Sequence, residues 1–341
     1  MRILVAPDKF AGTLSADEVC DAFTAGWLER TPSDVVDAQP MSDGGPGFLA
    51  ALAAGFETPL TPVTTTGPVG EPVTAELLVV GDDGERIAYV EAAQACGLAL
   101  APEPRHPLDA STAGVVALLE AALDSGATTV VVGVGGTAST DGGRPVVEAF
   151  PRRWPKDVAL VAATDVDAPL LGPTGAARSF APQKGASDAE VDALERRLAA
   201  WAASGTVDPS TPGAGAGGGL GYGLLRLGAT RVSGAALVAD AVGLADGVAT
   251  ADLVVTGEGR LDFSSLRGKV VSHVAGLAMA SATPCLVLAG SASVGRREAG
   301  ATGIDEIYAL DEIVGHEAAL ARPAQSVGQA AAAMARDWSR R

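Results

Sequence analysis

Charged and hydroxyl side chains stand beside glycines at four places where an apolar, strand-like run of the sequence ends. Backbone amides of such loops, isolated lysines and helix starts commonly hold phosphate groups, and carboxylates can hold a metal ion or accept a proton. In α/β sheets these loops gather at the carboxyl ends of the strands, where ligands bind. The four segments are 6–15 (APDKFAGTLS), 41–48 (MSDGGPGF), 133–143 (GVGGTASTDGG) and 254–269 (VVTGEGRLDFSSLRGK).

The segment 133–143 has the most unusual composition of the four. Gly135 and Gly136 let another group approach the backbone closely, and Thr137 and Ser139 supply hydroxyls before Asp141. Amides and hydroxyls suit phosphate oxygens, while an Asp can hold a metal ion or accept a proton. No Gly-Lys-Ser/Thr follows, so the segment is not a Walker A loop. A tight strand-to-helix connection is the alternative interpretation, but it leaves the hydroxyl cluster unexplained.

The other three segments carry charges beside glycine. In the first, Asp8 and Lys9 precede a capping box formed by Ser15 and Glu18, so helix capping is an alternative to anion binding. In the second, Asp43 opens a DGG sequence that could be only a tight turn. In the fourth, four charged side chains lie just after a predicted strand: Glu258, Arg260, Asp262 and Lys269. A surface ion-pair network is the alternative interpretation of these charges.

Composition excludes several classes of function. The chain has 341 residues with 24 basic and 41 acidic side chains, a formal net charge of −17, which argues against nucleic acid or an anionic membrane as partner. Its apolar runs are too short to span a bilayer, and its first residues lack a signal-peptide pattern. The three cysteines show no metal spacing, so we expect buried, reduced thiols in a cytoplasmic protein.

Strand-like and helix-like runs alternate, which predicts an α/β fold with a mainly parallel sheet and helices on both faces. From residue 64 the alternation of Val and Thr and the turn sequence GDDG (81–84) predict antiparallel or mixed pairing. We therefore expect residues 1–63 and 250–341 to form one domain and residues 64–249 an inserted α/β domain with a mixed sheet, with the active site in the cleft between them. We expect the Gly-rich segment 213–223 to be an irregular loop, a linker or a surface of close approach.

Six segments of this chain together resemble the type I glycerate kinase family in their order and spacing. They are PDKFAGTLSA, PMSDGG, GVGGTASTDGG, DVDAPLLGPTGAARSFAPQKGA, PGAGAGGGLG and ADLVVTGEGRLDFSSLRGK, and they span most of the chain. The resemblance implies a Rossmann-like α/β domain with a second α/β domain inserted. It also implies a cytoplasmic enzyme that uses ATP and Mg²⁺ to phosphorylate D-glycerate to 2-phosphoglycerate.

The resemblance, with the chemistry of phosphoryl transfer, gives each residue a predicted role. The predicted catalytic residues are Asp43, Asp141, Glu258 and Lys184. The predicted nucleotide-binding residues are Lys9, Gly135, Gly136, Thr137, Ser139, Gly257 and Lys269. Asp8, Arg260 and Asp262 are the predicted contacts to glycerate or a similar hydroxy acid. Asp165 and Asp141 are the predicted Mg²⁺ ligands.

Three departures from the family pattern keep alternatives open. Ala11 stands where the family commonly has Lys, Pro46 stands where it usually has Glu, and the segment after Asp141 is shorter. A kinase for another small hydroxy acid and a non-catalytic relative that binds a nucleotide or metabolite are therefore the alternative hypotheses. A homodimer is also left open.

Overall fold

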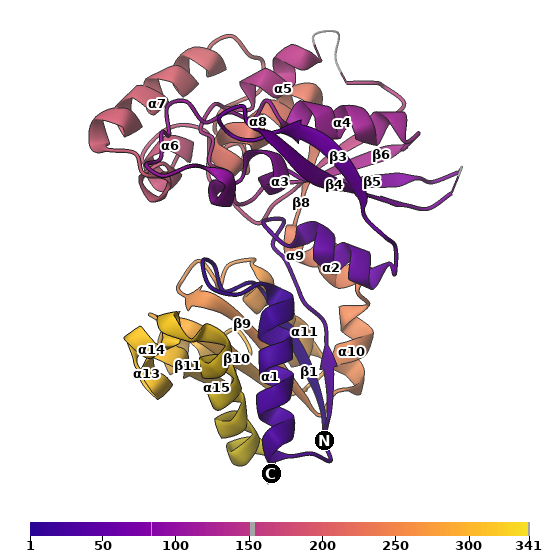
Figure 1. Ribbon diagram of the computed structural model, residues 1–341, viewed down its shortest axis with the longest axis vertical. Helices are drawn as coiled ribbons and strands as arrows, with labels where there is room; N and C mark the ends of the chain where they lie inside the picture. Colours follow the sequence, from indigo (N-terminus) through magenta and orange to yellow (C-terminus); the bar gives the residue numbers. More distant parts are fainter. Residues whose placement is uncertain (83, 151–153, 340–341) are drawn as a thin grey trace. The chain divides into compact units, whose positions relative to one another are not determined.

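The computed structural model describes residues 1–82, 84–150 and 154–339, and the chain divides into two compact units. Unit 1 comprises residues 1–43 and 235–341, and unit 2 comprises residues 44–234. Unit 2 is thus a continuous insertion into unit 1 (Figure 1). Its limits differ from the expected 64–249, because the first helix after residue 43 packs on strands of unit 2.

Unit 1 is built on a five-stranded, fully parallel sheet in the order β11-β10-β9-β1-β2. The N-terminal strand lies between β9 and β2, so the two ends of the chain share one sheet, as the sequence predicts. The strands are β1 (Arg2–Pro7), β2 (Val35–Ala38), β9 (Leu253–Leu261), β10 (Cys285–Ala292) and β11 (Glu306–Ala309). The helices are α1 (Ala16–Arg30), α9 (Gly234–Ala241), α10 (Leu244–Thr250), α11 (Val270–Ala280), α12 (Arg296–Gly300), α13 (Leu310–Val314), α14 (His316–Ala321) and α15 (Pro323–Trp338).

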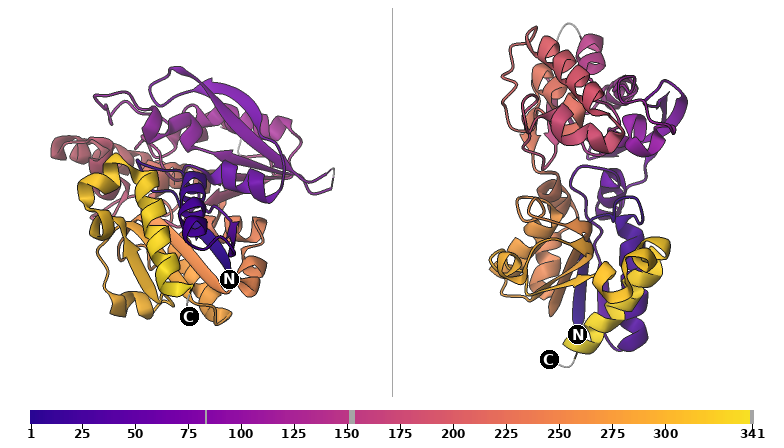
Figure 2. Two further views of the ribbon diagram at one scale, coloured as in Figure 1. Left: turned by 60° about the horizontal axis from the view of Figure 1, so that its bottom comes forward. Right: turned by 90° about the vertical axis from the view of Figure 1, so that its left-hand side faces the viewer.

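Helices α1 and α15 lie side by side on one face of this sheet (Figures 1 and 2). Alternate residues of the strands, such as Ile3 and Val255, share one buried core with Phe23 and Trp27 of α1. Helix α11 contacts β1, β9 and β10 and covers the other face. The predicted capping box opens α1: the Ser15 hydroxyl accepts from the Glu18 amide at 3.2 Å, and the Glu18 carboxylate accepts from the Ser15 amide at 2.8 Å.

Unit 2 contains a six-stranded mixed sheet in the order β3-β4-β5-β6-β7-β8. Pairing is antiparallel from β3 to β5 and parallel from β5 to β8, which confirms the predicted mixed sheet; residue 83 of the expected hairpin turn lies outside the described residues. The strands are β3 (Thr61–Thr66), β4 (Pro72–Val80), β5 (Ile87–Glu91), β6 (Thr129–Gly133), β7 (Ala159–Ala163) and β8 (Thr230–Val232). The helices are α2 (Phe48–Gly55), α3 (Ala93–Cys96), α4 (Val115–Asp124), α5 (Arg144–Ala149), α6 (Ala176–Phe180), α7 (Asp188–Ala202) and α8 (Ala216–Leu227), with 3-10 turns η1 (Leu98–Leu100) and η2 (Pro182–Lys184).

Both limits of unit 2 follow from packing that the sequence pattern does not reveal. Helix α2 contacts β4 and β5, which brings residues 44–63 into unit 2. At the other end, α10 contacts α11 and β1, which brings residues 235–249 into unit 1.

The Gly-rich segment 213–223 is not the irregular loop that we expected from its composition. The segment begins with a turn that includes Gly213 (φ 89°), and Gly217, Gly218 and Gly219 leave helical geometry, with φ of 58°, 65° and 89°. The chain is helical from Leu220 to Leu227. Leu220, Tyr222 and Leu224 are buried in the cores of unit 2. Burial of these large side chains outweighs the cost of glycine in a helix, which is about 1 kcal/mol per residue.

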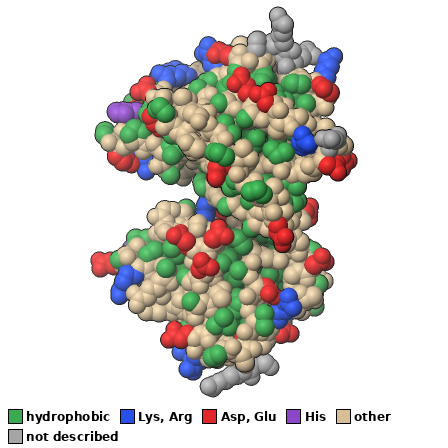
Figure 3. All heavy atoms as spheres, turned by 45° about the vertical axis from the view of Figure 1, so that its right-hand side comes forward, with side chains coloured by type: hydrophobic (Ala, Val, Ile, Leu, Met, Phe, Trp, Pro, Cys, Tyr) green, Lys and Arg blue, Asp and Glu red, His purple; other side chains and the backbone are tan. Residues whose placement is uncertain are grey.

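The surface agrees with the acidic composition. On the face drawn in Figure 3, Asp and Glu side chains are scattered and do not form one patch. No helix among the described residues is long and apolar enough to cross a membrane. Cys20, Cys96 and Cys285 are buried and free, as predicted.

The contact between α1 and α15 provides a test of the packing in unit 1. A Cβ at Gly26 would lie 2.6 Å from the Cα of Gly328, so Gly26→Ala should lower the free energy of unfolding by about 1–3 kcal/mol. Gly276→Ala in α11 meets no atom within 4 Å and should instead stabilise by up to about 1 kcal/mol. Denaturant unfolding of both variants measures the difference; equal stabilities would contradict this packing.

Candidate functional site

A buried lysine is the central feature of the candidate site in unit 2. Lys184 ends η2, is 4 % exposed, and donates hydrogen bonds from Nζ to the Ser139 carbonyl at 2.5 Å and to Thr137 Oγ1 at 3.4 Å. Among the described residues it forms no ion pair with a carboxylate. Burial lowers the pKa of Lys184 to about 8, and the field of Asp141 offsets only part of that effect. A buried cation without a counter-ion is costly unless an anion comes to it.

The loop around this lysine presents backbone donors that have no partner among the residues that the structure describes. Among the described residues, no acceptor receives a hydrogen bond from the amides of Gly136, Thr137, Ser139 or Thr140, and the last three residues are at most 3 % exposed. The Thr140 hydroxyl is also buried without a partner. Since buried amides are nearly always paired, these groups together with Lys184 form the kind of nest that binds anions.

The loop 134–143 connects β6 to α5 and is shaped by close backbone packing. A Cβ at Gly218 would lie 2.9 Å from Lys184 Nζ, and a Cβ at Gly219 would lie 2.7 Å from the Cα of Gly142. The Gly142 amide donates to the Gly218 carbonyl at 3.1 Å. The left-handed glycines of α8 therefore form a wall behind the loop that no other residue type could replace.

Two groups of this loop that we expected to contact a ligand, the Gly135 amide and the Asp141 carboxylate, form hydrogen bonds within the chain. The Gly135 amide donates to the Gly44 carbonyl at 2.9 Å, so it does not face a ligand. Asp141 accepts from the Thr112 amide at 2.7 Å, the Thr112 hydroxyl at 3.0 and 3.2 Å, and the Gly143 amide at 3.1 Å. Burial raises the pKa of Asp141, which these hydrogen bonds counteract. Asp141 thus holds the start of α5 to the segment before α4.

Trp201 of α7 supports the same loop from the side. Its indole N–H donates to the Gly142 carbonyl at 3.1 Å. The guanidinium of Arg226 stacks over the ring at 4.0 Å from its centroid, a cation–π contact that fixes the indole. Sequence analysis missed Trp201, because it lies outside the motifs and only the fold brings it to the loop.

Unit 1 brings a second group of predicted residues together at the carboxyl ends of its strands. Lys9 Nζ lies 3.2 Å from a carboxylate oxygen of Asp8 and 3.2 Å from one of Asp43. Burial raises the pKa of Asp8 to about 6 despite Lys9. Burial alone would lower the pKa of Lys9, but Asp43 and Asp8 outweigh it and raise that pKa.

Glu258 stands beside Asp8 in this group. The Asp8 amide donates to the Gly257 carbonyl at 2.8 Å, which ties the end of β1 to β9. Glu258 is 8 % exposed and its Oε1 has no hydrogen-bond partner. Burial raises the pKa of Glu258 to about 7, although Ser265 and Lys269 lower it in part. Asp8 and Asp262 add like charge that favours the protonated form.

The remaining predicted residues of unit 1 differ in their surroundings. Glu258 and Arg260 lie within β9, not after it as expected, because β9 continues its pairing with β10 up to Leu261. Arg260 is exposed. Asp262 accepts from the Ser264 amide and hydroxyl at 2.8 and 2.6 Å, which lowers the pKa of Asp262. Lys269 is half-buried and immediately precedes α11.

Among the described residues, no cluster of three or more His, Cys, Asp or Glu side chains could hold a metal ion. Mg²⁺ bound with a nucleotide needs only one or two carboxylates, because phosphates and waters complete its shell. Of the predicted ligands, Asp165 is half-buried in the loop after β7, and Asp141 has both oxygens engaged by Thr112 and Gly143.

The position of Trp201 predicts a specific effect on anion binding. Trp201→Phe keeps a ring beside Arg226 but removes the hydrogen bond to Gly142, so we expect inorganic tripolyphosphate to bind about three- to tenfold more weakly. Trp154→Phe is the matched control, because Trp154 donates to the Val158 carbonyl at 2.8 Å. Both variants should lose a similar free energy of unfolding. Titration calorimetry should show weaker tripolyphosphate binding for Trp201→Phe and not for Trp154→Phe. Equal tripolyphosphate affinities would exclude a positioning role for Trp201.

Comparison with known proteins identifies the family. The model of the glycerate kinase family matches residues 3–154 and 147–339. Glycerate 2-kinase of Escherichia coli is 35% identical, with 92% of each chain covered, and glycerate kinase of Bacillus subtilis is 36% identical, with 91% of this chain and 90% of that one covered. The fold matches the crystal structure of a candidate glycerate kinase 2 from Salmonella typhimurium LT2 at a TM-score of 0.74, with 32% identity over 100% of this chain and 98% of that chain. The chain therefore belongs to the glycerate kinase family and is a small-molecule kinase.

Proposed function

We propose that this kinase transfers the γ-phosphoryl group of ATP, with Mg²⁺, to the 2-hydroxyl of D-glycerate and forms 2-phosphoglycerate. The names of the relatives support the acceptor, and one of them is a glycerate 2-kinase. The observation that supports the transfer most directly is the buried Lys184 beside amides that lack partners. Phosphoryl transfer is catalysed mainly by positioned donors and positive charge around the transferring group.

We assign the phosphate contacts to the loop of unit 2. Lys184 and the amides of Gly136, Thr137, Ser139 and Thr140 would donate to phosphate oxygens, and the approaching anion would restore the charge balance around Lys184. Asp141 and Trp201 would act as positioning residues, since both hold the backbone of Gly142 and Gly143.

We assign the acceptor chemistry to the group in unit 1. In the reaction the acceptor oxygen forms a bond to the γ-phosphorus, the bond from that phosphorus to ADP breaks, and the hydroxyl proton must leave. Glu258 would accept this proton, because it is buried, has one oxygen without a partner, and has a pKa of about 7. Lys9 and Arg260 would contact the glycerate carboxylate.

Mg²⁺ would neutralise phosphate charge when bound with ATP. We propose Asp165, a half-buried carboxylate in the loop after β7, as its protein ligand. We further propose a cytoplasmic enzyme, since three buried free thiols suit a reducing compartment.

The direct test incubates the purified chain with ATP, Mg²⁺ and D-glycerate and measures ADP release together with the phosphoglycerate isomer formed. We expect 2-phosphoglycerate. Turnover only with a related hydroxy acid would reassign the acceptor, and nucleotide binding without turnover of any hydroxy acid would favour a non-catalytic relative.

The pKa of Lys184 gives the first prediction from this proposal. A lysine with a pKa of about 8 loses its charge as the pH rises through 8, so tripolyphosphate affinity should fall over that interval. Lys184→Met should remove this pH dependence and lower kcat/KM by about 10²–10³. Its unfolding free energy at pH 7 should not fall, because the substitution removes an uncompensated buried charge. Binding that persists unchanged to pH 10 would contradict the assignment.

Glu258 gives the second prediction. A general base must be deprotonated, so kcat/KM should rise as the pH increases through about 7, and it should fall again above about 8, where Lys184 loses its charge. Glu258→Gln should lower kcat by about 10²–10⁴ and abolish this rise. Glu312→Gln, at an exposed glutamate of α13, is the control. A Glu258→Gln enzyme with the wild-type pH profile would assign the proton transfer elsewhere.

A further inference from the structure

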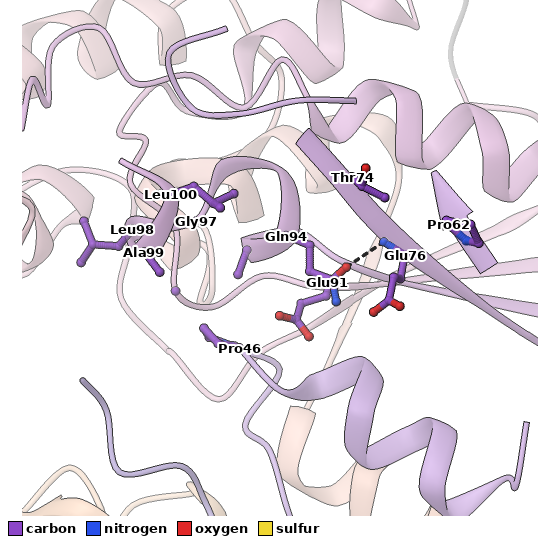
Figure 4. A pocket seen from close by; sticks show the side chains of 12 residues that line it. Pro46, Pro62, Thr74, Glu76, Glu91, Gln94, Gly97, Leu98, Ala99 and Leu100 are labelled. Atoms are coloured by element: carbon purple, nitrogen blue, oxygen red, sulfur yellow. Dashed lines mark hydrogen bonds between the residues drawn. The ribbon is translucent and has the colours of Figure 1, made fainter. Parts of the chain in front are cut away.

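Two glutamates are buried in the described part of the chain, and they lie beside different kinds of donor. Glu91 is 5 % exposed, lines a pocket of unit 2 (Figure 4) and accepts from the Leu49 backbone amide at 3.1 Å. Glu258 is 8 % exposed, and the donor beside its carboxyl group is the side chain of Ser265. A backbone amide points in one fixed direction, whereas a hydroxyl can rotate and change its acceptor. Ser265 is therefore a polar group of unit 1 whose orientation can respond to the charge of Glu258.

Ser265 lies in the turn that follows β9 and is completely buried. Its amide donates to the Asp262 carbonyl at 3.0 Å, and its Oγ accepts from the Asp262 amide at 3.0 Å. The Asp262 carboxylate in turn accepts from the amide and the hydroxyl of Ser264 at 2.8 and 2.6 Å. These hydrogen bonds fix the position of Ser265 Oγ and leave its proton for another acceptor.

Two acceptors compete for the hydroxyl proton of Ser265. The Arg260 carbonyl lies 3.5 Å from Oγ, which is too long for a strong O–H···O hydrogen bond. The second acceptor is the Glu258 carboxyl group. Burial raises the pKa of Glu258, and the hydrogen bond from Ser265 is the largest effect that opposes burial. Because an ionised acceptor forms the stronger hydrogen bond, the proton turns to Glu258 when that carboxyl group is charged.

The charged groups that face Glu258 do not supply this stabilisation by themselves. Lys269, just before α11, lowers the pKa of Glu258 by less than Ser265 does. Asp8 at the end of β1 and Asp262 after β9 both raise that pKa. The nearby Lys9 is already paired with Asp8. One lysine thus faces two carboxylates, so a neutral donor is needed to favour the ionised form of Glu258.

We infer that Ser265 is the positioning residue of the proposed base: its hydroxyl donates to the ionised carboxylate of Glu258 and leaves Oε1 to accept the proton of the acceptor hydroxyl. The inference rests on the proposed function for the role of Glu258, but the hydrogen bond itself is independent of turnover. When Glu258 takes up the proton, its carboxyl group becomes neutral, and the Ser265 hydroxyl turns to the Arg260 carbonyl.

The test uses Ser265→Ala in the full-length protein, because alanine removes the hydroxyl and keeps the backbone hydrogen bond to the Asp262 carbonyl. Ser326→Ala is the matched control, since Ser326 of α15 is 3 % exposed and donates to the Arg322 carbonyl at 2.9 Å. NMR of the Glu258 side-chain carboxyl group measures its pKa without turnover, and the pH profile of kcat/KM measures it during catalysis. Denaturant unfolding shows how much stability each variant loses.

We expect Ser265→Ala to raise the pKa of Glu258 by about one pH unit, because the ionised form loses its donor, and Ser326→Ala to leave it within about 0.2. The acidic limb of kcat/KM should move by the same amount and lower kcat/KM at pH 7 by about fivefold, with KM for glycerate changed less than about twofold. The alkaline limb, which Lys184 sets, should stay near pH 8. In a Glu258→Gln background, Ser265→Ala should lower kcat/KM by less than about twofold more, because the base is already absent.

Ser265→Cys keeps the test decisive if Ser265→Ala does not fold, because its S–H group is a weaker donor and should still raise the pKa of Glu258. An unchanged Glu258 pKa in either folded variant would overturn the inference. An equal loss of kcat/KM with and without Glu258 would do the same, since it would make Ser265 a structural residue only. A raised Glu258 pKa in Ser265→Ala, for a wild-type protein that forms no phosphoglycerate, would refute the proposed function and support the hydrogen bond.

Discussion

The burial of one ammonium group, with no carboxylate partner in the described part of the chain, explains the arrangement of unit 2. Lys184 donates hydrogen bonds to the Ser139 carbonyl and the Thr137 hydroxyl, and burial lowers its pKa to about 8. A folded protein normally pairs such a charge or replaces it with an apolar residue. The chain instead surrounds it with buried amides that also lack partners across residues 1–82, 84–150 and 154–339, which is a costly arrangement unless an anion completes it.

The surrounding structure supports that arrangement through backbone packing. Three consecutive left-handed glycines of α8 bring the backbone against the loop, Asp141 ties Gly143 to Thr112, and Trp201 holds Gly142. The loop is thus preorganised by groups that do not face the proposed phosphate position. Such preorganisation is the main contribution that a protein makes to phosphoryl transfer.

The sequence predicted the local features well, because they depend on neighbouring residues. The capping box at Ser15, the parallel placement of β1 and the mixed sheet of unit 2 follow from spacing and alternation. The sequence could not predict features that depend on packing between residues far apart in the chain. The burial of Leu220 and Tyr222 makes a helix of a segment whose glycines indicate a loop, and pairing with β10 extends β9 through Glu258 and Arg260. Asp141 has an evident motif, but its hydrogen bonds to Thr112 come from a segment 29 residues away.

The candidate functional groups of the two units differ in charge. Unit 2 offers a cation and amide donors, whereas unit 1 gathers Asp8 and Asp43 around Lys9 and places Glu258 beside Asp8. The most direct test of the account is the pKa of Lys184 itself, measured by NMR of the side-chain ammonium with and without tripolyphosphate. The account predicts a pKa of about 8 in the free protein and a clear rise when the anion binds. A pKa near the ordinary lysine value of about 10.4 in the free protein, or one that tripolyphosphate does not change, would contradict it.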